Sequence, residues 1–426
     1  MSSLKLVSLT GAAFALISGQ SIAEPVITGD LAKTTVFANT YMTSGANTKV
    51  LGNVTSGGVE TTGAGSQVVG NVMSGGAANV GASIVGGSQT ITSVGGFVRS
   101  GGVVTTGDGS IVKGDITSSG AANVGANASA GGSVVSGDVG TAGANAKITG
   151  NFTSVGAGTI GDSARVGGDM ASGGLTTVGA NAWVGGTVKT GGDAVSSASA
   201  MTNGLTSSIL SYVAYVAKQV LDVQTYLTNY MAGTGLAQVL AATMTMDATL
   251  GAGVYSAASL STTAGTTLLL DAAHKDNQLW IFNIADILKF GGATKIKIIN
   301  GGINEQVFWN VGSGYANSGD GAQIVGTILA KTYVEIGANS TVTSSDDSCG
   351  GVFSQTSYVS TGDNAIIGGE GCTSTVSPSS TTSTPIPEPA TYTLMLAGLG
   401  MMGFMIRAKK AKHPSGLPLA ESPVPA

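Results

Sequence analysis

The stretch TGDGSIVKGDITSSGAAN, residues 106–123, is one unit of an 18-residue repeat that runs from residue 44 to residue 195. The unit at residues 142–159, AGANAKITGNFTSVGAGT, has the same pattern. The second residue of every unit is glycine, and the ninth is glycine in all units except the one with Ser88. Fixed repeats are typical of solenoids, in which each unit buries its apolar side against the next. A disordered Gly/Ser/Thr-rich linker, the alternative, would share the composition but lack the phase.

The repeat length favours one type of solenoid. Eighteen residues divide into three sides, each long enough for a short strand and a corner. We therefore predict an all-β-dominated fold, a parallel β-helix of roughly triangular cross-section. Apolar residues at the seventh and eleventh positions are expected to form internal ladders. Residues 80–105 carry eight extra residues, which we expect to form a loop at one corner.

Two sets of repeat positions carry polar residues. The tenth and twelfth positions flank the inward eleventh and are expected to point outward, but they include the charged residues Asp169 and Lys189. The eighteenth position shares strand parity with the apolar sixteenth, so we expect it to point inward or to lie at a corner. The eighteenth position is occupied by Thr61, Asn79, Thr105, Asn123, Thr141, Thr159 and Thr177.

Composition argues against several classes of function. The chain has 426 residues, 68 of them glycine, and only 10% are charged, with a net charge of −5. Nucleic-acid binding requires a basic patch, so we expect no nucleic-acid partner. The body of the chain contains one histidine, His274, and has no nucleophile motif, zinc-ligand spacing or phosphate loop. We therefore predict that the protein is not an enzyme and binds no metal or cofactor.

Both termini carry signals of export. Residues 1–23 combine Lys5, an apolar stretch and small residues before the expected cleavage site, as in a secretory signal peptide. A first solenoid strand is the alternative. The predicted solenoid domain spans residues 24–372, and all nine prolines lie outside residues 26–376. Cys349 and Cys372 are either a disulfide, in an oxidising compartment, or two free thiols.

The C-terminal region has three parts. After a Ser/Thr/Pro-rich linker, residues 373–386, come Pro387, Glu388 and Pro389, an apolar run and a basic cluster ending at residue 412. This order resembles the PEP-CTERM sorting signal. The resemblance implies processing by an exosortase in a Gram-negative bacterium, transient anchoring in the inner membrane, and export to the cell surface or beyond. A plain membrane anchor is the alternative, and the tail 413–426 departs from the usual pattern.

Residues 198–231 interrupt the repeats. Apolar residues recur there at spacings of three and four, and no glycine or proline lies between Leu205 and Met231. The pattern predicts an amphipathic helix that covers one apolar face of the solenoid. A membrane span is the alternative, but polar residues such as Lys218 and Asp222 are spread through the segment.

The segments after the helix, residues 240–372, predict further strands with bulkier residues. Their order resembles the bacterial and fungal ice-binding proteins, most clearly over residues 240–345, where VFWNVGSG (307–314) and GTILAKT (326–332) are the most specific parts. The N-terminal coils match this architecture more loosely, and their regular period also resembles the polymer-forming bactofilins. The ice-binding resemblance implies a right-handed triangular β-helix, a helix packed along one side, and one flat face that adsorbs to ice.

Some members of that family carry on the binding face a loose four-residue pattern of Thr, then Ala or Gly, then any residue, then Thr or Asn. Matches to it make candidate ice-binding residues of Thr263, Thr266, Asn339, Thr341, Thr361, Asn364, Asn127, Asn145 and Asn181. Two hypotheses follow. The first is a secreted protein that adsorbs to ice and inhibits its growth or recrystallisation. The second is a structural or adhesive solenoid within an extracellular matrix of exopolysaccharide, without ice activity.

Overall fold

The computed structural model describes residues 26–82, 90–191, 198–199, 202–230, 237–343 and 350–369. These residues belong to the first of two compact units, Met1–Ser374, and the second unit is Thr375–Ala426. The predicted signal peptide, cysteine pair, linker, sorting segment and tail therefore lie outside the described residues. Among the described residues, no helix is long and apolar enough to cross a membrane.

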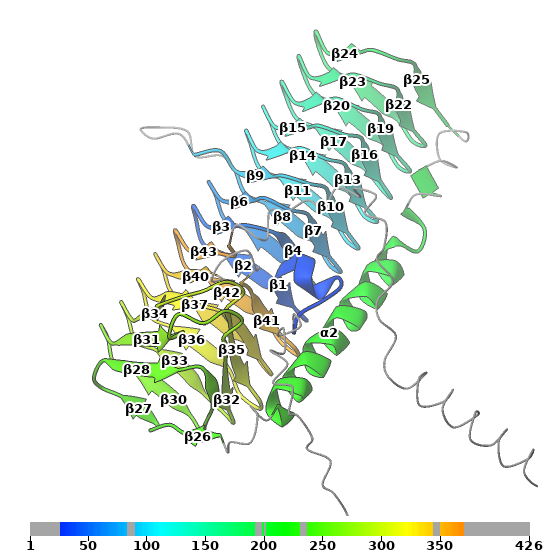
Figure 1. Ribbon diagram of the computed structural model, residues 1–426. Coiled ribbons are helices and arrows are strands. Elements are labelled where there is room, and N and C mark those ends of the chain that lie inside the picture. The colour runs from blue at the N-terminus through cyan, green and yellow to red at the C-terminus, as the bar shows by residue number, and fades with distance from the viewer. Residues whose placement is uncertain are drawn as a thin grey trace, which may run out of the picture. The chain divides into compact units, whose positions relative to one another are not determined.

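Three parallel sheets form the sides of a triangular β-solenoid, as predicted (Figure 1). Sheet A consists of β1 (Thr34–Ala38), β4 (Asn53–Ser56), β7 (Val72–Ser74), β10 (Val98–Ser100), β13 (Ile116–Ser118), β16 (Val134–Ser136), β19 (Phe152–Ser154), β22 (Met170–Ser172), β25 (Val188–Thr190), β26 (Gln238–Val239), β29 (Gly253–Ala257), β32 (Leu279–Ile284), β35 (Gln306–Val311), β38 (Thr327–Ala330) and β41 (Val352–Ser354). Sheet B consists of β2 (Met42–Ser44), β5 (Glu60–Thr62), β8 (Ala78–Val80), β11 (Val104–Thr106), β14 (Ala122–Val124), β17 (Gly140–Ala142), β20 (Gly158–Ile160), β23 (Thr176–Val178), β27 (Thr243–Met244), β30 (Leu260–Thr262), β33 (Leu288–Phe290), β36 (Ala316–Ser318), β39 (Val334–Ile336) and β42 (Val359–Thr361). Sheet C consists of β3 (Lys49–Val50), β6 (Gln67–Val68), β9 (Ser93–Val94), β12 (Ile111–Val112), β15 (Ser129–Ala130), β18 (Lys147–Ile148), β21 (Arg165–Val166), β24 (Trp183–Val184), β28 (Ala248–Gly251), β31 (Thr267–Asp271), β34 (Lys295–Ile299), β37 (Gln323–Val325), β40 (Thr341–Thr343) and β43 (Ile366–Ile367).

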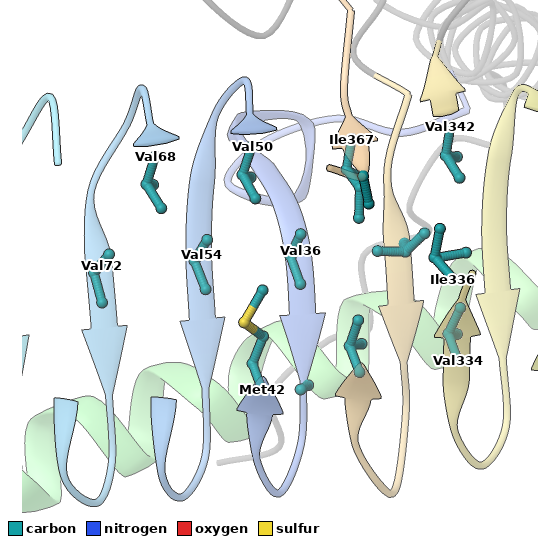
Figure 2. Packing of buried hydrophobic residues seen from close by; sticks show 14 of the residues in the cluster. Val36, Met42, Val50, Val54, Val68, Val72, Val334, Ile336, Val342 and Ile367 are labelled. Carbon is teal, nitrogen blue, oxygen red and sulfur yellow. The ribbon is translucent and has the colours of Figure 1, made fainter. Parts of the chain in front are cut away.

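The order of coils in space differs from their order in the chain. The N-terminal half, β1–β25, extends from the middle of the solenoid to one end, and the C-terminal half, β26–β43, starts at the other end and returns to the middle (Figure 1). The first coil stacks on the last: β1 pairs with β41, β2 with β42 and β3 with β43, all in parallel. We call this junction the seam. Figure 2 shows the core continuing across it, from Val50 and Val54 to Ile367 and Val342.

A single long helix connects the halves. Helix α2 (Leu205–Asn229) lies within the predicted segment and runs along sheet A across the seam (Figure 1). Its apolar stripe of Ile209, Val213, Val216 and Val220 packs on outward side chains of sheet A, together with a short 3-10 helix, η1 (Leu31–Lys33). The helix therefore covers the middle of one of the three faces.

The predicted inner ladders are confirmed through most of the N-terminal half. Side chains at the seventh position, such as Val50 and Ile148, and at the eleventh, such as Val54 and Phe152, are almost fully buried. The eight extra residues fall between β8 and β9, at the corner between sheets B and C, where residues 83–89 lie outside the described part.

The thirteenth position forms a buried serine ladder that the sequence analysis missed. Its members are fully buried where sheet A turns toward sheet B. The Ser136 hydroxyl donates to the carbonyl oxygens of Gly120, 3.0 Å away, and Val139, 2.9 Å away. Serine can occupy this apolar interior because its hydroxyl satisfies backbone groups at the corner. The repeat of Ser56, Ser74, Ser100, Ser118, Ser136, Ser154 and Ser172 was the signal.

Candidate functional site

Sheet B presents a regular polar row on its outer face. In strands such as β5 and β14 the two terminal residues are buried and the central residue is partly exposed. Pairing between neighbouring strands aligns these central residues in one line, for example Asn123 beside Thr141. The polar row, as we name it, is Thr43, Thr61, Asn79, Thr105, Asn123, Thr141, Thr159 and Thr177.

The direction of this row corrects the sequence prediction. Side chains at the eighteenth position point outward. As expected from strand alternation, they share the direction of the sixteenth position, but that direction is toward solvent. The sixteenth position is itself on the surface, since Val59 is 44% exposed and Val139 is 39% exposed. The true inward positions are the seventeenth, as in Ala122, and the first of the next unit, as in Val124. Apolar character at the sixteenth position is therefore not a sign of burial in this sheet.

Two further rows flank the polar row. On one side lies the apolar row, which consists of Tyr41, Val59, Ala77, Val103, Ala121, Val139, Ala157 and Leu175. On the other side lies the glycine at the second position. A Cβ on Gly63 would lie 2.3 Å from the carbonyl oxygen of Gly45, so the close approach of successive coils requires glycine there.

The polar row changes character across the seam. It continues through Ser360, Glu335, Asn317 and Lys289 in the C-terminal half. A carboxylate and an ammonium thus replace the neutral hydroxyl and amide groups of the N-terminal half. Only the segment from Thr43 to Thr177 is a continuous array of uncharged hydrogen-bonding groups.

A stack of tyrosines crosses the seam. The rings of Tyr315, Tyr333, Tyr358 and Tyr41 stack in sequence with centroid distances of 4.5, 5.0 and 4.7 Å. The Tyr358 hydroxyl donates to Glu335 Oε1 over 2.8 Å. Burial, followed by this contact with Glu335, raises the pKa of Tyr358. The tyrosines extend the line of the apolar row with much larger side chains.

The other two sides of the solenoid are different in chemistry. The outer row of sheet C includes Lys49, Lys147 and Arg165 in the N-terminal half and Lys295 in the C-terminal half. Sheet A is covered in its middle by α2. The expected outward tenth position lies at the corner between sheets C and A, where the Asp169 carboxylate accepts the backbone amide of Thr187 over 2.7 Å.

Two predicted ice-binding residues are buried. Thr266 and Thr361 are each 4% exposed and face the interior corner between sheets B and C. The Thr361 hydroxyl lies 3.5 Å from that of Thr48, and the Thr266 hydroxyl lies 3.0 Å from that of Thr263. Neither Thr266 nor Thr361 can contact a surface ligand, so these two predictions are corrected. The four-residue pattern had not separated inward from outward positions.

All five predicted asparagines have a different position from the one expected. They occupy the corner between sheets B and C with positive φ angles between 56° and 58°: Asn127, Asn145, Asn181, Asn339 and Asn364. Glycine takes the equivalent place at Gly65 and Gly109, with φ of 73° and 68°. Asparagine is one of the few residues that tolerate this left-handed conformation. The backbone turn alone therefore explains the Gly-Ala-Asn pattern, and these residues are exposed at the corner rather than on the flat face.

The last two candidates are separated. Thr263 is exposed at the corner after β30, whereas Thr341 lies on the outer row of sheet C, paired with Gln323 and Ile366. The structure thus does not bring the nine predicted residues together on one face. Within the described residues, no group of three or more His, Cys, Asp or Glu side chains could hold a metal ion.

Comparisons with known proteins point to one family. A family model described as ice-binding-like matches residues 121–367, and a PEP-CTERM protein-sorting motif matches residues 385–410. No curated protein has a matching sequence. Among solved structures, the ice-binding protein of the Antarctic ascomycete Antarctomyces psychrotrophicus is 20% identical, with 55% of this chain and 92% of that chain covered and a TM-score of 0.29. An ice-binding protein domain of Shewanella frigidimarina is 18% identical, with 54% and 92% covered and a TM-score of 0.32.

Proposed function

Because the chain belongs to the ice-binding-like family, we propose that it adsorbs to ice through the outer face of sheet B in the N-terminal half. The observation that carries this proposal is the uncharged polar row from Thr43 to Thr177, flanked by the apolar row and by glycine. No charge interrupts it, whereas the outer row of sheet C includes Lys49, Lys147 and Arg165, and sheet A is partly covered by α2.

The spacing and chemistry of the row suit a crystalline water surface. Adjacent strands place equivalent side chains about 4.7–4.9 Å apart along the solenoid. Hydroxyl and amide groups both donate and accept hydrogen bonds, so they can hold ordered waters. The threonine methyl groups and the apolar row limit competing hydration. Binding then arises from repetition over many coils rather than from one strong contact.

Neighbouring polar side chains also order each other. The Thr141 hydroxyl donates to Asn123 Oδ1 over 2.6 Å, which holds both side chains in one orientation across two coils. Fixed side chains lose little conformational entropy when they bind waters or a surface. This pre-organisation supports adsorption to a rigid lattice.

Ice recrystallisation and thermal hysteresis assays on the full chain test the proposal. We expect shaped ice crystals, a measurable gap between melting and freezing temperatures, and partition of the protein into slowly growing ice. A chain that is folded by circular dichroism but changes neither crystal shape nor growth rate, even at high concentration, would contradict it.

A second candidate function rests on the sorting motif. The match to the PEP-CTERM motif implies an exported cell-surface protein processed by an exosortase. We therefore also consider a stiff solenoid within an exopolysaccharide matrix, which requires no ice-matching face. Retention of the chain by purified exopolysaccharide, combined with the absence of hysteresis, would favour this function over ice adsorption.

A further inference from the structure

We propose that the two ends of the solenoid stack on each other, so that copies of this chain assemble head to tail. At one end the outermost strands are β25, β23 and β24, and at the other they are β26, β27 and β28. Within the described residues, no strand pairs with the outer edge of any of these six (Figure 1). Backbone groups along such edges are templates for another strand.

The two ends are complementary in direction. Every strand pairs in parallel with its neighbours along the whole solenoid, including across the seam. The β23–β25 end therefore presents the edge that would normally receive a next coil, and the β26–β28 end presents the edge that normally rests on a previous coil. Two identical ends would meet in antiparallel directions, whereas unlike ends continue the parallel ladder. This contact is heterologous and extends into a filament.

At both ends, apolar side chains occupy inward positions that are buried in other coils but are exposed or only partly buried here. At the β23–β25 end, Val178 is 44% exposed and Val188 is 50% exposed, whereas the equivalent Ile160 and Met170 one coil below are fully buried. At the opposite end, Met244 pairs with Thr262 of the next coil, and the side chain of Thr262 is buried. Open ends of this kind leave the interior of the solenoid in contact with water.

When the two ends stack, apolar side chains of one copy lie against apolar side chains of the next, and hydroxyl groups lie beside hydroxyl groups. Aligning the strands by their inward positions sets Val178 over Met244 in sheet B and Val184 over Ala248 in sheet C. The same register sets Thr177 of one copy beside Thr243 of the next, which is followed by Ser261. The uncharged row on sheet B would thus meet a further hydroxyl-bearing segment at each junction.

The chain already contains a junction of the same type. At the seam, coils that are more than 300 residues apart stack without a peptide connection between them. Their backbones still form the regular ladder, with the Gly45 amide donating to the Thr361 carbonyl over 2.8 Å and the Lys49 amide donating to the Ala365 carbonyl over 2.8 Å. At the seam, therefore, coils that are not consecutive in the chain continue the parallel ladder.

Sedimentation velocity on the full chain in ice-free buffer, with negative-stain electron microscopy, tests this inference independently of any ice activity. We expect assemblies that grow with concentration and appear as unbranched rods. The double variant Val178→Asp/Val188→Asp puts carboxylates into one end and is expected to remain monomeric. Val139→Asp, at a similarly exposed valine in the middle of the solenoid, is the matched control and is expected to assemble like the wild type.

A mixing experiment separates end-to-end contact from other association. Met244→Asp blocks the opposite end and is also expected to be monomeric alone. Each variant retains one good end, so their mixture should form dimers and no longer species. A wild type that stays monomeric at all concentrations would overturn the inference, as would assembly that persists in either end variant. Circular dichroism of each variant identifies loss of fold.

Discussion

Asparagine has different structural roles in this protein, according to its position in the coil. Asn123 lies in the polar row on a strand, whereas Asn145 lies at a corner with a φ of 58°. The sequence pattern identified the corner asparagines because glycine and alanine precede them, but that pattern is a turn signature. The strand residues had a weaker signal, namely threonine or asparagine alternating with two inward positions. The prediction that Thr266 and Thr361 lie on the surface failed for the same reason. A local sequence pattern does not determine the direction of a side chain, and both residues are buried.

Substitution of a corner asparagine tests whether its role is to allow the left-handed backbone conformation. Asn145→Val places a β-branched side chain in the left-handed region, so we expect the free energy of unfolding to fall by about 1–2 kcal/mol. Asn145→Gly is expected to be close to neutral because glycine adopts this conformation readily. Chemical denaturation measures both. Equal stability of the valine variant and the wild type would show that the turn does not constrain this residue.

A buried carboxyl group gives the fold a pH dependence. Glu60 is fully buried in sheet B, and the Thr62 hydroxyl donates to its Oε1 over 2.6 Å. Burial raises the pKa of Glu60 from 4.5 to about 7, although the hydrogen bond from Thr62 acts in the opposite direction. The folded state therefore retains a proton that the unfolded chain releases.

The sign of the effect follows from this difference. Below pH 4.5 both states are protonated and Glu60 imposes no penalty; as the pH rises from 4.5 to about 7, the free energy of unfolding falls. Above pH 7 the loss reaches about 3 kcal/mol. Glu60→Gln should remove this part of the pH dependence, as measured by denaturation between pH 4 and pH 8. The same slope in Glu60→Gln and wild type would contradict the assignment, and Glu335→Gln is a control on the same sheet.

At the scale of elements, the helix and the inner ladders of the seventh and eleventh positions were predictable from the sequence. Which positions of the sheet B strands point inward was not predictable. Helix α2 follows from apolar spacing, and the seventh and eleventh rows are strongly apolar. The seventeenth row is inward but includes glycine, because Phe152 fills the space: a Cβ on Gly140 would lie 2.8 Å from Phe152 Cζ. The large side chain of Phe152 in the eleventh row thus leaves room only for glycine in the seventeenth row. The exposed sixteenth row therefore looks more hydrophobic in the sequence than the buried seventeenth row.

Polar contacts fix the C-terminal part of α2 on sheet A. Asn310 is buried, and its Nδ2 donates to the Gln224 carbonyl over 3.1 Å and to Thr228 Oγ1 over 3.0 Å. Gln224 Nε2 in turn donates to the Val311 carbonyl over 3.1 Å. These bonds determine the position of the helix along the sheet, which apolar packing alone leaves less defined.

Removal of this anchor should loosen the helix. Asn310→Ala removes the hydrogen bonds from Asn310 Nδ2 to the Gln224 carbonyl and to Thr228 Oγ1 of α2, so we expect a loss of about 2 kcal/mol in the free energy of unfolding. Hydrogen exchange should accelerate in the last turns of α2. Asn317→Ala, in a partly exposed position on sheet B, is the control and is expected to change neither quantity. Unchanged exchange in Asn310→Ala would contradict the anchoring role.

At the scale of the whole molecule, the resemblance to ice-binding proteins is confirmed by the family match, but the order of the coils was not anticipated from the sequence. The period predicts that units stack, yet it contains no information on which unit stacks on which when a helix intervenes. Here the first coil meets the last, and the seam separates the uncharged part of the polar row from the part that contains Glu335 and Lys289. The proposed face therefore has a defined boundary.

Thermal hysteresis of matched tyrosine variants tests the central claim most directly. Thr105→Tyr/Thr141→Tyr places large rings in the uncharged part of the polar row, whereas Asn317→Tyr changes the same row between Glu335 and Lys289, and Thr341→Tyr changes sheet C. We predict that hysteresis is lost in the double variant and retained in both controls, with all four proteins equally folded. Hysteresis that survives in Thr105→Tyr/Thr141→Tyr, or that disappears in Thr341→Tyr, would contradict the assignment of this face.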